Sequence, residues 1–597
     1  DEGNAVSQTE EPCLTHHAML AAWGQYAQAM GVIDAIEAIQ MQQKTVDHRP
    51  QTKVLEFLVA ILGGFAYLKD ISLSAHPLDQ DAVVARAWRQ PGWADHSGVS
   101  RTLSQLSEIE VQAIEAALDQ ISQPLIDREV MLAAGSGRIV LDGDLSPRRV
   151  SNTSQTYSEA AFGHMSDQVG LGYQAALVSM VSPTFGRLLL SVAQHPGSTV
   201  SSTQAEALVF AAEQRMGRKP LRRVDLLEQR IDGIWAIYEQ QKQRVREAEQ
   251  NLLQAQQAWR SIDAQLQTAQ CALQVLEQTY QDYQRIERPH SHLAKVRKQV
   301  VIYQRRLKRN EQEQQDAQRW LDRQRNHLAE QIDVLNALLE RLKRFEAENA
   351  ANHAPIQAVL RLDAGFGTEA NVALLIEMDY ELYTRPYGTW LSGELKLRVQ
   401  AGVRWQRVGS NAEMVAWPGQ HLSDFPYPLD LARERFWLGE GQYRQAALLH
   451  FGQDPVMQDL SNWFQFYNAR QTIEAANKEG KQVFEIRHLK VRTRPALKLQ
   501  EVFTLFAANF VRFASLWLAE QCPQVPEGWK QANQPKVKQQ VKVGAQSDAW
   551  VSWLDQEVLL LRFEEHSLFA GRSLTVKPVL AFQPVLPFAK SCFFPST

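Results

Sequence analysis

The sequence predicts a mixed α/β protein with a helical N-terminal region, a long antiparallel coiled-coil hairpin and a β-rich insertion. Three observations lead to this prediction. Residues 358–384 contain an apolar strand, a Gly-rich turn, a helical stretch and a second strand in succession. Apolar residues recur in alternating steps of three and four from Leu227 to Phe345, which is typical of paired helices. Residues 387–459 change to short alternating segments bounded by Gly and Pro.

The N-terminal part of the chain, from about His16 to Glu129, is predicted to be helical, with a strong apolar run from Lys53 to Gly64. Ser100 is a suitable N-cap for a helix in this region. A helix-turn-helix that contacts DNA bases is one interpretation, and a plain helical packing domain is the alternative.

A predicted strand follows this region, and it carries two acids. Gly137 to Ser146 includes Asp142 and Asp144, which lie on one face of the strand because they are two residues apart. For either acid alone, the alternative interpretation is a residue of a strand-end turn. Segments 151–157 and 170–181 are interpreted as the second and third strands of the same sheet.

A second acid follows another strand. Asp363 directly follows the apolar run from Ala358 to Leu362 and precedes a Gly-rich turn. A helix from Glu369 to Met378 and a strand from Tyr380 to Thr384 are predicted next. Asp363 thus lies at the carboxyl end of a strand, where open α/β sheets bind their ligands.

The heptad pattern predicts two helical arms that are separated at Pro289. Each arm is long enough for the hairpin to project about 80 Å at 1.5 Å per residue. The second arm is rich in Lys and Arg from Lys295 through Arg309. Three uses remain open: a dimerisation arm, a clamp on the DNA backbone, or a passive insertion.

The β-rich insertion is predicted to include strands at 395–399 and 403–408. Its tryptophans are candidates for stacking on an unpaired base, although each alone is more often a core aromatic. They are Trp390, Trp405, Trp417 and Trp437. A helix from Leu499 to Glu520 is predicted to close the domain, and the remaining residues are Pro-punctuated and uninformative.

The pattern Y-x2-R-x3-E-x6-K occurs near the end of the chain, at Tyr467, Arg470, Glu474 and Lys481. On one continuous helix, steps of three, four and seven return to nearly the same face. A phenol, two cations and a carboxylate would then point toward one place. The alternative is a solvated charged face, or an Arg–Glu pair that only supports the helix.

This pattern resembles the signature of the DDE transposases of bacterial insertion sequences, in the group defined by a Y-R-E-K motif. The resemblance implies an RNase H-like catalytic domain with three acids, of which Asp363 and Glu474 are the second and third. The family usually places Ser or Thr two positions after the first acid, which favours Asp144, followed by Ser146. Asp142 remains the alternative first acid.

The implied chemistry is phosphoryl transfer assisted by two Mg2+ ions about 4 Å apart, with Mn2+ as an acceptable substitute. Asp144, Asp363 and Glu474 would be the catalytic metal ligands. Arg470 and Lys481 would hold DNA phosphates, and Tyr467 would bind a phosphate oxygen or pack against a terminal base.

The resemblance therefore implies a transposase that binds double-stranded transposon ends, cleaves them and joins their 3′-hydroxyls to target DNA as a homodimer. Two alternatives remain open. One is a catalytically silent, domesticated DNA-binding or coiled-coil scaffold protein. The other is a stand-alone RNase H-like nuclease, which would cut without joining. The long hairpin departs from the ordinary members of this group.

The expected domain organisation divides the catalytic core into three parts. The domains are a helical N-terminal DNA-binding domain (14–135), the first part of the RNase H-like core (136–215), the coiled-coil hairpin (222–350), the second part of the core (355–388), the β-rich insertion (389–460), the final core helices (461–520) and a C-terminal region (521–597).

Composition agrees with a large protein of several domains. The chain has 597 residues, 45% hydrophobic content and a formal net charge of −4, so DNA contact must depend on local basic patches. The four cysteines, Cys13, Cys271, Cys522 and Cys592, form no C-x-x-C and fit a reducing compartment. Because no segment is a convincing membrane span, we expect a cytoplasmic, nucleoid-associated bacterial protein without a membrane partner.

Overall fold

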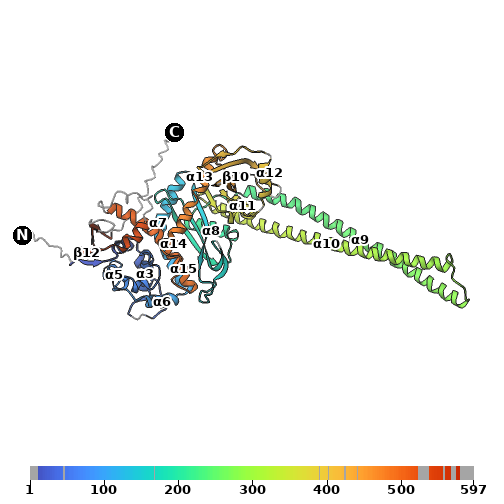
Figure 1. Ribbon diagram of the computed structural model, residues 1–597, viewed down its shortest axis with the longest axis horizontal. Helices are drawn as coiled ribbons and strands as arrows, with labels where there is room; N and C mark the ends of the chain where they lie inside the picture. Colours follow the sequence, from blue (N-terminus) through green and yellow to red (C-terminus); the bar gives the residue numbers. More distant parts are fainter. Residues whose placement is uncertain are drawn as a thin grey trace, which may run out of the picture. The chain divides into compact units, whose positions relative to one another are not determined.

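The computed structural model describes residues 11–578, apart from 45–46, 167, 389, 401, 423–424, 440, 522–536, 555–557 and 566–572. The chain divides into two compact units. Asp1–Leu221 and Asn352–Thr597 form the core unit, and Arg222–Ala351 forms the hairpin unit (Figure 1). Cys522 and Cys592 lie outside the described residues, whereas Cys13 and Cys271 are exposed free thiols.

In the described residues, the core unit is built on a ten-stranded mixed sheet with the order β3-β4-β2-β6-β7-β11-β10-β9-β8, and β5 pairs with β4. Strand β2 is antiparallel to β4 and parallel to β6, which is parallel to β7. These parallel and antiparallel pairings confirm the predicted mixed α/β class. The strands are β2 (Ile139–Arg149), β3 (Ala161–Met165), β4 (Gln168–Met180), β5 (Leu188–Pro196), β6 (Ala358–Leu362), β7 (Tyr380–Thr384), β8 (Gln406–Arg407), β9 (Ala412–Gln420), β10 (Leu429–Gly439) and β11 (Gln442–Phe451).

Helices pack on this sheet and on one another. They include α8 (Ala205–Met216), α11 (Glu369–Glu377), α13 (Leu460–Asn468), α14 (Gln471–Gln482) and α15 (Arg494–Gln521). The helices predicted at 369–378 and 499–520 are confirmed by α11 and α15. Helix α15 meets the length and composition test for a membrane span, but 78% of its apolar window is buried inside the fold, against elements that include α3, α7 and β5.

The N-terminal region is helical, as predicted, with α1 (Ala18–Met30), α2 (Val32–Glu37), α3 (Pro50–Leu62), α4 (Asp70–Leu73), α5 (Ala82–Ala87), α6 (His96–Ser104) and α7 (Glu108–Gly135). The prediction that Ser100 is an N-cap is wrong. Helix α6 begins earlier, because the carboxylate of Asp95 accepts a hydrogen bond from the Gly98 amide at 2.9 Å. Asp at this position satisfies an amide that the first turn leaves without a partner.

The two ends of the described chain form a small antiparallel sheet. Its four strands are β1 (Cys13–Thr15), β12 (Ala549–Leu554), β13 (Val558–Phe563) and β14 (Ser573–Val576), and β1 pairs with β12. Helix α16 (Val537–Lys542) precedes β12 in the chain.

Two strand predictions were wrong, and a third is only partly confirmed. Residues 151–157 form a loop, and the second strand of this group is β3. The predicted third strand, 170–181, is confirmed, because it falls almost entirely within β4. Residues 395–399 belong to helix α12 (Ser392–Gln400). Leu395 is fully buried while Leu397 is 68% exposed, as a helix requires, since strand residues two apart share a face. The ion pair between Glu394 and Arg398 also favours the helix. Of 403–408, only β8 forms a strand.

The hairpin unit consists of α9 (Val224–Asp282) and α10 (His292–Ala351), which lie side by side (Figure 1). Their direction is antiparallel, because Gln241 contacts Gln324 toward the middle of the hairpin and Glu277 contacts Arg297 near the turn. The two long helices agree with the predicted hairpin, and the segment that joins them contains Pro289.

Candidate functional site

The parallel pairing of β2 and β6 brings two acids together. Asp142 lies opposite Arg361 in the register, so Asp144, two residues along β2, lies next to Asp363, which directly follows β6. The carboxylate of Asp363 accepts a hydrogen bond from the Gly365 amide at 2.9 Å and caps the short helical turn Ala364–Phe366. Sequence separation between these acids is large, and the sheet alone makes them neighbours.

The electrostatics of Asp144 link three carboxylates. Burial raises the pKa of Asp144 to about 6, and the negative charges of Asp363 and Glu474 add to this rise. Arg470 and the Leu145 amide act in the opposite direction. Asp144 therefore lies within the electrostatic range of both other predicted acids and of the predicted phosphate-binding arginine.

Asp142, the alternative first acid, is already occupied. Its two carboxylate oxygens accept hydrogen bonds from the Arg361 guanidinium at 2.7 and 2.8 Å, and Thr472 Oγ1 donates to it at 2.7 Å. Both members of this ion pair are buried. A carboxylate held in this way has little capacity left for a metal ion, and this geometry favours Asp144 as the first acid.

The Y-R-E-K residues do not lie on one continuous helix, and that prediction was wrong. Helix α13 ends at Asn468, and α14 begins at Gln471 after a break at Ala469 and Arg470. Arg470 is the N-terminal flanking residue of α14. The motif therefore occupies the end of one helix and the length of the next.

Tyr467 lies inside the protein. It is 3% exposed, and its hydroxyl donates to the carbonyl oxygen of Leu362 at 3.3 Å. The Arg385 guanidinium lies 5.3 Å from the centre of its ring, and burial raises the pKa of Tyr467. Its hydroxyl thus supports the end of β6, the strand that places Asp363, and is not directed at solvent.

Arg470 lies among the acids. Its side chain is 14% exposed, and Nη2 donates to Glu474 at 2.9 Å. Its Nη1 is buried and has no hydrogen-bond partner among the described residues. Burial lowers the pKa of Arg470, but Tyr467, Asp144, Asp363 and Glu474 outweigh this and raise it. A buried N–H group without a partner is costly, and an anionic ligand would satisfy it.

The other two motif residues lie on α14. Glu474 is 56% exposed, and the i,i+4 pair with Arg470 that was the alternative interpretation is present. Lys481 lies in the last turn of α14. Burial and the nearby Arg148 lower the pKa of Lys481, while Asp144 and Glu501 oppose this shift. Lys481 therefore also lies within the electrostatic range of Asp144.

Sequence reasoning missed Asn477. Its Nδ2 donates to Asp144 Oδ2 at 2.5 Å, and its Oδ1 is buried without a hydrogen-bond partner among the described residues. Asn477 is three residues after Glu474 and four before Lys481 on α14, so it lies on the same helix face. That spacing could have identified Asn477 from the sequence, but the motif considered there contains only charged residues and a tyrosine.

The donor set suits a hard divalent cation, although no group of three or more Asp, Glu, His or Cys in the described part of the chain is close enough to hold one. Asp144, Asp363 and Asn477 offer carboxylate and amide oxygens, which Mg2+ and Mn2+ prefer. Glu474 points its carboxylate at Arg470. The buried, unpaired Oδ1 of Asn477 is an oxygen that a cation or its bound water would satisfy.

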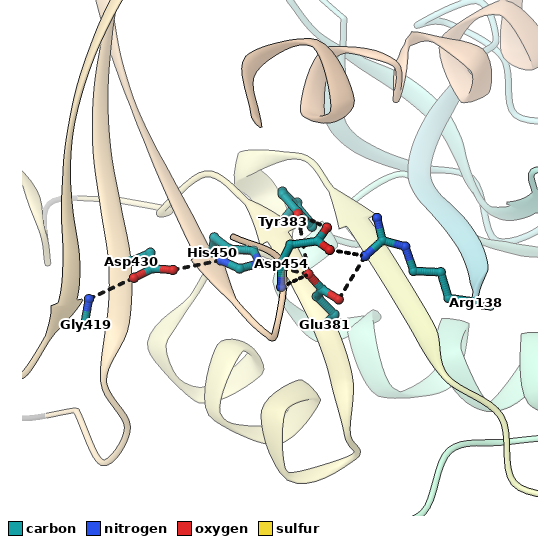
Figure 2. Close-up of polar contacts among 7 residues, drawn as sticks. All are labelled: Arg138, Glu381, Tyr383, Gly419, Asp430, His450 and Asp454. Carbon is teal, nitrogen blue, oxygen red and sulfur yellow. Dashed lines mark hydrogen bonds and ion pairs between the residues drawn. The ribbon is translucent and has the colours of Figure 1, made fainter. Parts of the chain in front are cut away.

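A second polar cluster lies where the β-rich insertion joins the core sheet (Figure 2). The ring of His450, on β11, lies between two carboxylates, with Asp430 of β10 at 3.0 Å and Glu381 of β7 at 3.1 Å. Burial lowers the pKa of His450, but these two carboxylates raise it overall. The two carboxylates thus stabilise the protonated form of His450.

The same cluster extends to the edge of β2. Arg138 binds Glu381 at 3.2 Å and Asp454 at 2.6 Å, and the Tyr383 hydroxyl donates to Asp454 at 2.5 Å (Figure 2). The cluster connects the parallel strands of the core to the antiparallel strands of the insertion. We call it the junction cluster. Its contacts hold the insertion to the core sheet.

The four candidate tryptophans differ in their surroundings. Trp390 donates to the Gly367 carbonyl at 3.3 Å, and Trp405 lies 4.3 Å from the Arg435 guanidinium. Trp417 is half-buried on β9. Trp437 is 42% exposed and packs edge-on against Tyr443. Trp437 is thus the most accessible of the four for stacking.

The comparisons with known proteins add nothing to this geometry. No family model and no curated protein sequence matches this chain. The function is therefore inferred from the arrangement of the site residues.

Proposed function

We propose that this protein is a DDE transposase that binds double-stranded transposon ends, cleaves them and joins their 3′-hydroxyls to target DNA. The observation that supports this most is the arrangement around Asp144. Asp363 lies beside it on the paired strand, and Glu474 and Arg470 lie within its electrostatic range. We further propose that the protein acts in the bacterial cytoplasm as a homodimer on paired DNA ends.

The sheet supports an RNase H-like core. The central strands have the order β5-β4-β2-β6-β7, in which the first three are antiparallel and β2, β6 and β7 are parallel. Asp144 lies on β2 and Asp363 follows β6, so two acids from adjacent strands meet, as such a core requires. The hairpin interrupts the chain between β5 and β6, and the β-rich insertion lies between β7 and the helix that carries Glu474.

Each site residue has a distinct role in this proposal. Asp144, Asp363 and Glu474 would hold two Mg2+ ions, for which Mn2+ can substitute. When bound, these ions would polarise the attacking oxygen and stabilise the leaving oxygen of an in-line displacement. The free Nη1 of Arg470 would bind a phosphate oxygen, and Lys481 would act as a second cation toward the DNA backbone.

Two neutral side chains would position the acids. Asn477 donates to Asp144 and so favours its ionised form, which a metal ligand requires. Tyr467 fixes the end of β6 through the Leu362 carbonyl. Glu474 must leave or share its bond to Arg470 when a phosphate and a metal ion arrive.

The test uses purified protein, the terminal DNA of its own element and Mg2+, and it measures cut ends and joined products. We expect both products from the unaltered protein and neither from Asp363→Ala or Glu474→Gln, which remove a ligand without opening the core. Glu369→Gln is the matched control, because Glu369 is an exposed acid on α11. Arg470→Ala should weaken DNA binding in a salt-sensitive way.

The outcome also separates the alternatives. DNA binding without any cutting would favour the silent scaffold protein, and cutting without joining would favour a stand-alone nuclease. Unchanged cutting by Glu474→Gln would contradict the proposed role of that acid.

A further inference from the structure

The hairpin has an uninterrupted basic segment on α10, near the turn that joins α10 to α9. Between Lys295 and Arg309 the chain has seven Lys or Arg residues and no Asp or Glu. All seven of these side chains belong to exposed residues. Since the whole chain has a net charge of −4, this segment is a local concentration of positive charge.

Five of these cations lie on one face of the helix. At 3.6 residues per turn, steps of three, seven, one and three residues keep them within a narrow sector. The set, which we call the basic stripe, is Lys295, Lys298, Arg305, Arg306 and Arg309. The seam residues Val296 and Val300 are buried in the hairpin. The basic stripe occupies the opposite side of α10, which faces solvent.

Few acids neutralise the basic stripe. Arg297, at its flank, binds Glu277 at 2.7 Å and Glu287 at 2.6 Å. Arg309 binds Glu313 at 2.9 Å but remains 80% exposed. The other four members have no ion-pair partner among the described residues. Their charges are therefore available to a ligand.

The dimensions and chemistry of the basic stripe fit duplex DNA. From Lys295 to Arg309 the helix rises about 21 Å. One strand of B-DNA presents roughly six phosphates over that length, at 3.4 Å per phosphate. The stripe contains no aromatic side chain of the kind that stacks on unpaired bases. The large exposed apolar residues beside the basic stripe are Val301 and Ile302, and these two aliphatic side chains are too small an anchor for a protein interface.

We propose that the basic stripe binds the sugar–phosphate backbone of duplex DNA without reading its sequence, and that the hairpin serves as a DNA-binding arm. This inference rests on the proposed function, in that DNA is taken to be the substrate. It adds a contact surface in the hairpin unit, separate from the acids of the core unit.

The experiment measures the affinity of the full chain for a short fluorescein-labelled duplex of arbitrary sequence, by fluorescence anisotropy over a series of KCl concentrations. EDTA is present, so that binding is measured without cleavage. The test variant carries Lys298→Ala, Arg305→Ala and Arg306→Ala. The control variant carries Arg244→Ala, Arg246→Ala and Arg323→Ala, which remove three exposed hairpin cations outside the basic stripe.

We expect the test variant to bind about tenfold or more weakly at low salt, with its log–log salt slope smaller by about 2 to 3, since each lost phosphate contact contributes about 0.9. The control variant should keep both the affinity and the slope. Equal losses of affinity in both variants would show that only the net charge of the hairpin matters, and this would overturn the proposal. Unchanged binding by the test variant would also overturn it.

Two other results would also overturn it. A changed sedimentation coefficient with unchanged DNA binding would make the stripe an interface between copies of this chain. A loss confined to single-stranded DNA would assign it to unpaired substrates. The two proposals can fail separately. If the unaltered protein does not cut DNA with Mg2+, the catalytic proposal fails, but weaker duplex binding by the test variant would still support the DNA-binding arm.

Discussion

Asn477 provides a residue-scale test of the acid site that is independent of the charged residues. Asn477→Ala removes the hydrogen bond to Asp144. We expect Mg2+-dependent cleavage to fall by about 10- to 100-fold, as is common when a group that orients a metal ligand is lost. DNA binding should be unchanged, and the free energy of unfolding should fall by only about 1 kcal/mol.

The exposed neighbour Lys478→Ala is the control for this change. Asn477→Asp distinguishes the two ends of the amide, because it retains an oxygen but cannot donate to Asp144. Activity in Asn477→Asp with none in Asn477→Ala would show that the oxygen matters more than the donor. Full activity in Asn477→Ala would contradict the positioning role.

Glu56 gives a residue-scale prediction about stability. This α3 acid is fully buried and accepts a hydrogen bond from the Ala94 amide at 2.8 Å, but its second oxygen has no hydrogen-bond partner among the described residues. Burial raises the pKa of Glu56 to about 9. Between its unfolded pKa and about 9, the unfolded chain loses this proton and the folded protein keeps it, so stability falls as pH rises.

Glu56→Gln removes this titration. We expect the variant to be more stable than the unaltered protein at pH 8, by an amount on the order of a few kcal/mol, and to show little difference near pH 4. Thermal or urea unfolding at the two pH values measures this. A difference that is the same at both pH values would show that Glu56 is already ionised in the folded protein.

Some properties of individual site residues could not be predicted from the sequence. Asp142 and Asp144 share one strand face, and in the sequence only the family resemblance, through Ser146, favours Asp144. The distinction comes from Arg361, which is distant in sequence and binds Asp142 through the β2–β6 pairing. The burial of Tyr467 likewise depends on its contact with the end of β6.

At the scale of elements, we expect the junction cluster to hold the insertion to the core sheet. His450→Ala would leave Asp430 and Glu381 as half-buried carboxylates without the cation that they share, although Glu381 would keep Arg138. Removing one partner from a fully buried ion pair typically costs about 3–5 kcal/mol. Because these carboxylates are only half-buried, we expect a loss below that range, about 1–3 kcal/mol, measured by urea unfolding at neutral pH.

The pH dependence of this loss has a defined sign. Because the pKa of His450 is raised in the folded protein, its contribution is complete below the unfolded value and disappears as pH rises through the folded value. The difference between His450→Ala and the unaltered protein should therefore be larger at pH 6 than at alkaline pH. The double change with Asp430→Asn should be milder than His450→Ala alone, and a more severe effect would contradict the ion-pair interpretation.

Elements with strong local signals were predictable, and those that depend on context were not. Strand β7 and helix α11 were predicted from short apolar runs, and the structure adds Thr368 as the N-cap of α11. Helix α12 was mistaken for a strand because apolar residues two apart suggested alternation, whereas only Leu395 is buried. The break between α13 and α14 contains no Gly or Pro, so the sequence does not predict it.

At the scale of the whole molecule, the hairpin should be separable from the core unit. The chain leaves and re-enters the core at one place, since Asn352 Nδ2 donates to the Lys219 carbonyl at 2.9 Å and the Ile356 amide donates to it at 3.3 Å. We expect a variant with 222–351 replaced by a short Gly-Ser linker to fold cooperatively and to bind duplex DNA more weakly, with a smaller salt slope. Circular dichroism and the anisotropy assay measure these, and an unfolded product would contradict the independence of the two units.

The hairpin was the most predictable large feature, because its heptads are local, whereas the small sheet formed by β1 and β12–β14 was not predicted at all. That sheet joins strands that are more than five hundred residues apart in the chain. During synthesis at about 5–20 residues per second, β1 leaves the ribosome roughly half a minute to two minutes before its partner exists. The first described strand of the protein is thus among the last to find its place, and until then its backbone groups are open to other strands or to chaperones.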